Sequence, residues 1–217
     1  MKETIRVFLA GDSTVQTYDS SKAPQAGWGQ YIGGHFDGCV RFLNHSMAGR
    51  SSRTFVEEGR LEAVLNEIGP GDWLFVQMGH NDANQKKPER YTDPQTEFPR
   101  YLKMYLDGAR KKGAFPLLIT PVARLHYQDG AFQNDFPEYC KAMKKLGEEE
   151  NVPVVDLMEL WIHRLEQAGP EAARAWYMVS ANGTDMTHFT EAGAGEVAAV
   201  LAQGIRRLNI PISKYVR

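Results

Sequence analysis

Cysteine, a strong charge of one sign and long hydrophobic runs are all scarce or missing in this 217-residue sequence. Every apolar stretch is under ten residues, too short for a membrane-spanning helix. The net charge of −2 provides no basic surface of the kind that nucleic-acid binding requires. Cys39 and Cys140 lie in no CxxC or Cys/His cluster, so we expect reduced thiols and no structural metal. No secretory hydrophobic segment precedes the first apolar run, which favours a cytoplasmic protein without a membrane partner.

The length and an apolar fraction of 42% fit a single domain over residues 1–217. Apolar runs predict strands at 7–10, 41–44, 72–78, 116–120 and 152–155. Helices are expected at 27–36, 55–68, 137–150 and 157–168, between Thr96 and Gly113, and after Thr190. This alternation predicts an α/β fold with a five-stranded parallel sheet covered on both faces, for which we expect the strand order 2-1-3-4-5.

The first strand ends in a turn that presents a serine. Gly11 and Asp12 interrupt the apolar run, and Ser13 follows them. Open α/β sheets bind ligands beyond the carboxyl ends of their strands, so Ser13 is a candidate nucleophile. Read alone, the same residues also fit a strand followed by a polar turn.

Near the other end of the chain, Asp185 and His188 stand three residues apart. A serine hydroxyl needs a base to take its proton as it attacks, and an imidazole can do so. A carboxylate on the second ring nitrogen fixes the tautomer of that imidazole. Short Asp-x-x-His matches also arise by chance in polar loops.

An ester hydrolase also needs donors for the oxyanion of its tetrahedral intermediate. The backbone N–H groups of Ser13 and Gly49 and the side-chain amide of Asn81 are candidates. A turn glycine and an Asx-type cap are the structural alternatives for Gly49 and Asn81. The order of these residues along the chain is more specific than any one of them.

Together these segments resemble the four sequence blocks of SGNH/GDSL hydrolases, over nearly the whole chain. Ser13, Gly49, Asn81 and His188 match the letters of that name. The segments GDSTVQ (11–16), GWGQ (27–30), AGRSSRTF (48–55), GHND (79–82), TPVAR (120–124) and DMTHFTEAGA (185–194) are most similar to the rhamnogalacturonan acetylesterase branch of the carbohydrate esterases. Thr14 departs from the general pattern, in which leucine is commoner.

The resemblance implies a flavodoxin-like three-layer α/β/α fold and a Ser13–His188–Asp185 triad. It further implies removal of acetyl groups from pectic sugars, without a metal or cofactor. Asp12 is expected to hold the turn before Ser13.

Several other residues are candidates for substrate binding. Arg50, Arg53 and Arg124 could each meet a uronate carboxylate through a bidentate guanidinium contact. Trp28 could stack on a sugar face, and His80 stands beside Asn81. Salt bridges, loop hydrogen bonds and core packing are the structural alternatives for these five.

The leading hypothesis is therefore a serine esterase that deacetylates pectic oligosaccharides. A lipase, thioesterase or other acylhydrolase is the alternative within the fold, but the polar loops of the active face favour a sugar-like substrate. A non-catalytic carbohydrate-binding protein is a third hypothesis. The sequence indicates no oligomeric state.

Overall fold

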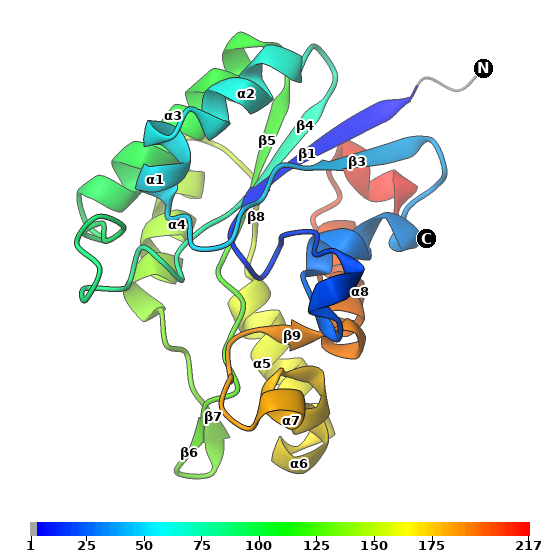
Figure 1. Ribbon diagram of the computed structural model, residues 1–217. Helices are drawn as coiled ribbons and strands as arrows, with labels where there is room; N and C mark the ends of the chain where they lie inside the picture. The colour runs from blue at the N-terminus through cyan, green and yellow to red at the C-terminus, as the bar shows by residue number, and fades with distance from the viewer. Residues whose placement is uncertain (1–3) are drawn as a thin grey trace.

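Five parallel strands form the centre of the fold in the computed structural model, which describes residues 4–217 (Figure 1). They are β1 (Ile5–Gly11), β3 (Val40–Asn44), β4 (Trp73–Gln77), β5 (Phe115–Ile119) and β8 (Val154–Val155). Their spatial order is β3-β1-β4-β5-β8, which confirms the predicted order of second, first, third, fourth and fifth. The crossover helices that link parallel strands explain why both faces of this sheet are covered.

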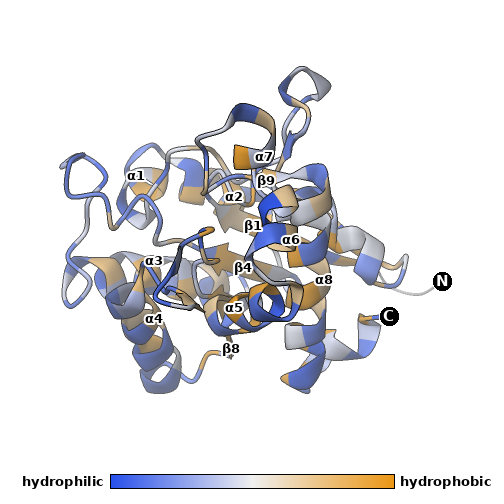
Figure 2. Ribbon diagram, turned by 90° about the horizontal axis from the view of Figure 1, so that it is seen from below, coloured by the Kyte–Doolittle hydropathy of each residue, from blue (hydrophilic) through white to orange (hydrophobic). Residues whose placement is uncertain are grey.

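The longer helices form two layers around the sheet. They are α1 (Ser52–Glu57), α2 (Arg60–Glu67), α3 (Glu97–Lys111), α4 (Pro137–Glu149), α5 (Leu157–Ala168) and α8 (Glu191–Arg207). The first four lie on one side of the sheet, and α5 packs against α8 on the other (Figure 1). Hydrophilic and hydrophobic stretches alternate along these helices, as an amphipathic covering layer requires (Figure 2). This is the predicted three-layer α/β/α arrangement.

The segments between these elements differ most from the predictions. The helix expected at 55–68 is two helices, because Gly59 adopts a left-handed conformation with φ of +74° between α1 and α2. The helix expected at 27–36 is two short 3₁₀ segments, Trp28–Gln30 and Ile32–His35. The expected loop at 121–136 contains a small hairpin of β6 (Tyr127–Gln128) and β7 (Ala131–Phe132). The irregular region at 170–184 includes α6 (Pro170–Ala173) and α7 (Val179–Asn182).

Backbone pairing joins an early segment of the chain to a late one beside the sheet. The short strand β2 (Gln25–Ala26) pairs antiparallel with β9 (Phe189–Thr190). The backbone N–H of Glu191 then donates to the carbonyl of Pro24 at 2.8 Å. The hydroxyl of Thr190 caps α8 as predicted, accepting from the backbone N–H of Gly193 at 3.2 Å. The segment before α8 is thereby held against the loop that follows β1.

None of the helices within residues 4–217 has the length and apolar character needed to cross a membrane.

Candidate active site

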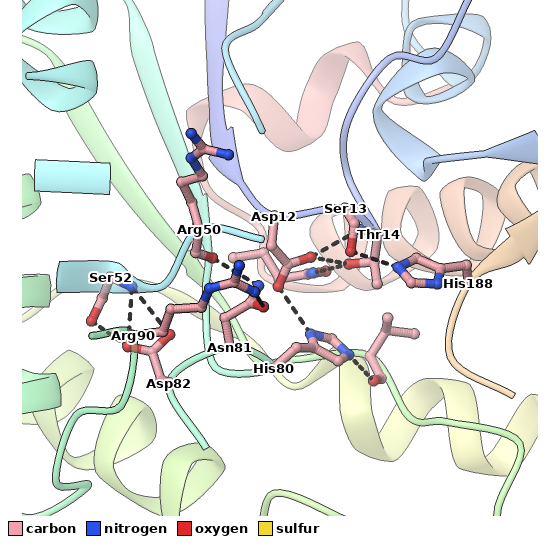
Figure 3. Close-up of polar contacts among 12 residues, drawn as sticks. Asp12, Ser13, Thr14, Arg50, Ser52, His80, Asn81, Asp82, Arg90 and His188 are labelled. Carbon is pink, nitrogen blue, oxygen red and sulfur yellow. Dashed lines mark hydrogen bonds and ion pairs between the residues drawn. The ribbon is translucent and has the colours of Figure 1, made fainter. Parts of the chain in front are cut away.

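Ser13, His188 and Asp185 are hydrogen-bonded in series at the carboxyl end of β1. Figure 3 shows the contact between Ser13 and His188. The Oγ of Ser13 lies 2.8 Å from Nε2 of His188. The other ring nitrogen of His188, Nδ1, lies 2.7 Å from Oδ2 of Asp185. The structure thus brings together three residues that the chain separates by up to 175 positions.

The backbone around His188 is fixed from several directions. Its neighbour Phe189 belongs to β9 and pairs with Ala26 of β2. The carbonyl of His188 accepts a hydrogen bond from the backbone N–H of Met178 at 2.8 Å. Oδ1 of Asp185 accepts from the backbone N–H groups of Thr187 at 2.9 Å and His188 at 3.0 Å. The imidazole is therefore oriented before any substrate arrives.

The same contacts keep Asp185 ionised. Partial burial by itself raises the pKa of this carboxyl group. The backbone N–H groups of His188 and Thr187 and the ring of His188 outweigh burial, and the pKa of Asp185 lies below its usual value. A charged carboxylate is the form that accepts a hydrogen bond from the protonated Nδ1 of His188.

A second, buried carboxylate supports the turn that carries Ser13. Oδ1 of Asp12 accepts from the backbone N–H of Thr14 at 2.9 Å and from its hydroxyl at 2.8 Å. Burial raises the pKa of Asp12, but the charge and hydrogen bond of His80 and the donors of Thr14 bring it below its usual value. Asp12 therefore holds the turn, as the sequence predicts.

His80 is part of this support and does not face a substrate site. Its side chain is buried, and the residue is only 7% exposed. Nδ1 lies 3.1 Å from Oδ2 of Asp12, and Nε2 lies 2.9 Å from the carbonyl oxygen of Val122. Both ring nitrogens are thus occupied by acceptors, and the prediction that His80 contacts substrate is wrong.

The prediction for Trp28 is also wrong, because this side chain lies in the core at 1% exposure. Its indole N–H donates to Oε1 of Gln77 at 2.8 Å, and Nε2 of Gln77 donates to the hydroxyl of Thr14 at 2.7 Å. Trp28 therefore connects the core to the Asp12–Thr14 turn, and a sugar ring cannot reach its face.

The candidate oxyanion donors lie in neighbouring loops. Gly49 has a φ of +79°, a left-handed conformation that favours glycine. The loop that contains it is tied to the end of β1, since the backbone N–H of Met47 donates to the carbonyl of Gly11 at 3.0 Å. The amide of Asn81 donates from Nδ2 to the carbonyl of Arg50 at 2.9 Å, which places Asn81 beside the residue that follows Gly49.

The three candidate arginines differ in what already binds them. Arg50 donates from Nε to Glu58 at 2.8 Å and from Nη1 to the carbonyl of Ala48 at 2.9 Å. Arg53 forms an ion pair with Glu97.

Arg124 has no carboxylate partner among residues 4–217 and packs over the ring of Phe136, 4.9 Å from its centroid. It lines a surface hollow together with Asp185, Thr187, His126 and Asp135. Of the three arginines, Arg124 is thus the one with a free charge on a hollow shared with Asp185.

Two supporting residues were missed from the sequence. Gln77 completes the buried link to Thr14. Arg90 lies against Asn81, with Nη1 3.4 Å from its Oδ1. The only signal for Gln77 is a polar residue ending an otherwise apolar strand, and Arg90 stands in a polar loop without any motif. Tyr18, which the sequence offers as a residue that could stack on a sugar, donates its hydroxyl to the carbonyl of Ser13 at 2.9 Å.

A doubly covered parallel sheet with a serine, an imidazole and a carboxylate in series at its carboxyl edge is typical of a hydrolase. The family model described as "GDSL-like Lipase/Acylhydrolase" matches residues 7–201. The chain belongs to this family and is a carboxylic ester hydrolase, which confirms the resemblance found in the sequence.

Two relatives from Bacillus subtilis (strain 168) match over almost their whole length. The chain is 54% identical over 210 residues to "Probable rhamnogalacturonan acetylesterase YesY", covering 97% of this chain and 96% of that protein. It is 41% identical over 226 residues to rhamnogalacturonan acetylesterase RhgT, covering 100% of this chain and 96% of that protein. The predicted similarity to the rhamnogalacturonan acetylesterase branch is confirmed.

Solved structures agree with the fold. The crystal structure of YxiM from Bacillus subtilis superposes with a TM-score of 0.86 at 30% identity, covering 96% of this chain and 58% of that one. This chain therefore spans little more than half of YxiM. Axe2, an acetylxylan esterase from Geobacillus stearothermophilus, gives a TM-score of 0.70 at 18% identity over 100% of this chain and 99% of that one. That level of identity speaks to the fold alone.

Proposed function

We propose that this chain is a serine esterase that removes O-acetyl groups from pectic, rhamnogalacturonan-type oligosaccharides. The observation that carries the proposal is the unbroken series from Ser13 Oγ to His188 and on to Asp185, at 2.8 and 2.7 Å. These distances lie within the range at which a base can take a proton from a nucleophile.

In the first half of the reaction, Oγ of Ser13 attacks the carbonyl carbon of the acetyl group. Nε2 of His188 takes the hydroxyl proton as the new C–O bond forms. Asp185 accepts a hydrogen bond from the Nδ1–H group and so stabilises the imidazolium. His188 then gives its Nε2 proton to the sugar oxygen as the bond between that oxygen and the acetyl carbon breaks. The sugar departs with a free hydroxyl, and Ser13 remains acetylated.

In the second half, water attacks the acetyl group on Ser13, and His188 takes a proton from that water. Collapse of the second tetrahedral intermediate releases acetate, and His188 returns the proton to Oγ. Both intermediates carry an oxyanion, for which we assign the backbone N–H groups of Ser13 and Gly49 and the amide of Asn81. The second hydrogen on Nδ2 of Asn81 remains free for this role, because only one is donated to Arg50.

The acetyl and pectic parts of the proposal rest on the two Bacillus relatives, whose names give that activity and whose sequences match from end to end. The residues support an acidic sugar at one further point. Arg124 has no carboxylate partner among residues 4–217 and shares its hollow with Asp185, so we assign it to a uronate carboxylate. We also propose that residues 1–217 form a single domain, because one continuous cluster of buried side chains spans the sheet and its covering helices.

The test is release of acetate from acetylated rhamnogalacturonan oligosaccharides, compared with acetylated xylan and chitin oligosaccharides and with nitrophenyl octanoate. We expect the rhamnogalacturonan substrate to be preferred and Ser13→Ala to abolish its turnover. Ser21→Ala, at an exposed serine, is the matched control. A preference for octanoate would indicate a general acylhydrolase. A folded protein whose Ser13 is not labelled by a serine-directed organophosphate would indicate carbohydrate binding without catalysis.

A further inference from the structure

The guanidinium group of Arg90 packs face-on against Gly49. A Cβ atom built on Gly49 would lie 3.3 Å from Nη1, 3.4 Å from Cζ and 3.4 Å from Nη2 of Arg90. Nearly equal distances to these three atoms mean that the plane of the guanidinium covers the glycine. A side chain at position 49 would have to push this group away.

The same guanidinium contacts Asn81, the other loop residue assigned to the oxyanion hole. Nη1 of Arg90 donates to Oδ1 of Asn81 at 3.4 Å, and Nδ2 of Asn81 donates to the carbonyl of Arg50 at 2.9 Å (Figure 3). An amide rotated by 180° would present its NH₂ group to the Arg90 cation and its oxygen to the Arg50 carbonyl. Both contacts would then be repulsive, so Arg90 helps to decide which end of Asn81 faces the site.

Arg90 is held in place by its backbone, and its charge is only weakly compensated. Its backbone N–H donates to the carbonyl of Lys87 at 2.8 Å. Two residues later, the hydroxyl of Thr92 donates to Oδ1 of buried Asp82 at 2.8 Å. Within residues 4–217, its one ion pair is with the mostly exposed Glu89, at 3.9 Å. This contrasts with Arg50, which is bonded to Glu58 at 2.8 Å.

We propose that Arg90 is a positioning residue of the oxyanion hole. It fixes the Asn81 amide with its NH₂ group available to the reacting carbonyl oxygen, and it supports the left-handed conformation of Gly49. A permanent positive charge also stands beside the point at which negative charge develops. The inference rests on the proposed esterase function, and it assigns Arg90 no contact with the sugar.

The decisive substrate is 4-nitrophenyl acetate, because it carries no carboxylate that Arg90 could bind. We expect Arg90→Met to lower kcat by about 10- to 100-fold, somewhat less than the loss of a complete oxyanion donor, with KM changed by less than about twofold. Arg90→Lys keeps the charge but loses the planar fork, so it should recover part of the rate. Lys86→Met removes an exposed positive charge from the same loop and should match the wild type.

A double-mutant cycle with Asn81→Ala tests whether Arg90 acts through that amide. In the Asn81→Ala background, Arg90→Met should cost clearly less in kcat than in the wild type, because the amide that it orients is gone and only its support of Gly49 and its charge remain. Thermal unfolding of each variant shows whether the fold persists, and Arg90→Gln replaces Arg90→Met if the latter does not fold.

Three results would overturn the inference. The first is an unchanged kcat for Arg90→Met, and the second is a loss of kcat that is equal in both backgrounds. The third is a loss confined to KM for acidic oligosaccharides, which would make Arg90 a carboxylate-binding residue. Wild-type activity and the Ser13→Ala variant report separately on the proposed function.

Discussion

Replacing Asp185 with asparagine changes one oxygen into an NH₂ group in a contact of known geometry. The remaining carbonyl oxygen can still accept from the backbone N–H groups of Thr187 and His188, so the loop should keep its shape. The NH₂ group then faces Nδ1 of His188, at the position where Oδ2 of Asp185 lies 2.7 Å away. Because two donors cannot share that contact, the neutral ring should move its proton from Nδ1 to Nε2.

That tautomer points an N–H at Ser13 Oγ, and a protonated Nε2 cannot act as a base. We expect kcat to fall by about 10⁴, equivalent to about 5 kcal/mol of barrier, by analogy with other serine triads. KM should change little, since Asp185 lies behind the imidazole relative to Ser13.

The assay is steady-state hydrolysis of 4-nitrophenyl acetate, with circular dichroism as the check on folding. Asp129→Asn is the matched control, because this exposed aspartate lies in the turn of the β6–β7 hairpin and has a positive φ that asparagine also accepts. A loss below about tenfold for Asp185→Asn would refute the reasoning, since another group or a water would then have to orient His188.

The remaining predictions concern stability. Burial raises the pKa of Asp82 to about 6. The folded protein therefore binds the Asp82 proton more tightly than the unfolded chain does. This contribution to the free energy of unfolding is complete below the unfolded pKa and is lost as pH rises through 6. In the wild type, the free energy of unfolding measured by urea titration should therefore decline by up to about 3 kcal/mol between pH 4 and 7, and Asp82→Asn should remove this decline. Gly193→Ala should destabilise by more than about 4 kcal/mol, because its Cβ would lie 1.9 Å from the carbonyl oxygen of Trp176. Gly195→Ala places its Cβ in open space on the same helix and should stabilise the protein by about 0.5–1 kcal/mol. Equal melting temperatures for the Gly193→Ala and Gly195→Ala variants would contradict the packing of α8. Trp28→Phe should cost about 2 kcal/mol by leaving buried Gln77 Oε1 without its donor, while an increase in KM for oligosaccharide would restore the stacking role rejected above.

The sequence predicted the parts of the fold that local patterns determine. Helix α5 begins and ends where expected, because Asp156 caps its first turn and Gly169 follows its last residue. The strand order could be predicted from the alternation of strands and helices together with the strand order that is common in folds of this type. The break between α1 and α2 was not predicted, because Gly59 stands inside an apolar pattern that continues on both sides of it.

The site divides in the same way. Ser13, Asp185 and His188 each follow or precede a recognisable element and match a family motif, so their juxtaposition could be predicted. Trp28 and His80 carry the same motif signal but are buried. Whether a motif residue faces substrate or supports the turn behind it depends on long-range contacts, such as that of Trp28 with Gln77, which a single sequence does not reveal.

Three histidine–aspartate pairs occur among residues 4–217, and what lies at the second ring nitrogen distinguishes them. His80 pairs with Asp12, but its Nε2 faces the carbonyl of Val122. His126 pairs with Asp135, which raises the pKa of His126, and its Nε2 faces the side-chain oxygen of Gln128 at 3.3 Å.

Only the third pair places a hydroxyl at that nitrogen. Nε2 of His188 lies 2.8 Å from Oγ of Ser13. A carbonyl or amide oxygen accepts hydrogen bonds but has no proton to give, so the first two histidines can hold loops and cannot activate a nucleophile. A hydroxyl does have a proton to give, and this difference is the physical reason for assigning the chemistry to His188 alone among the three paired histidines.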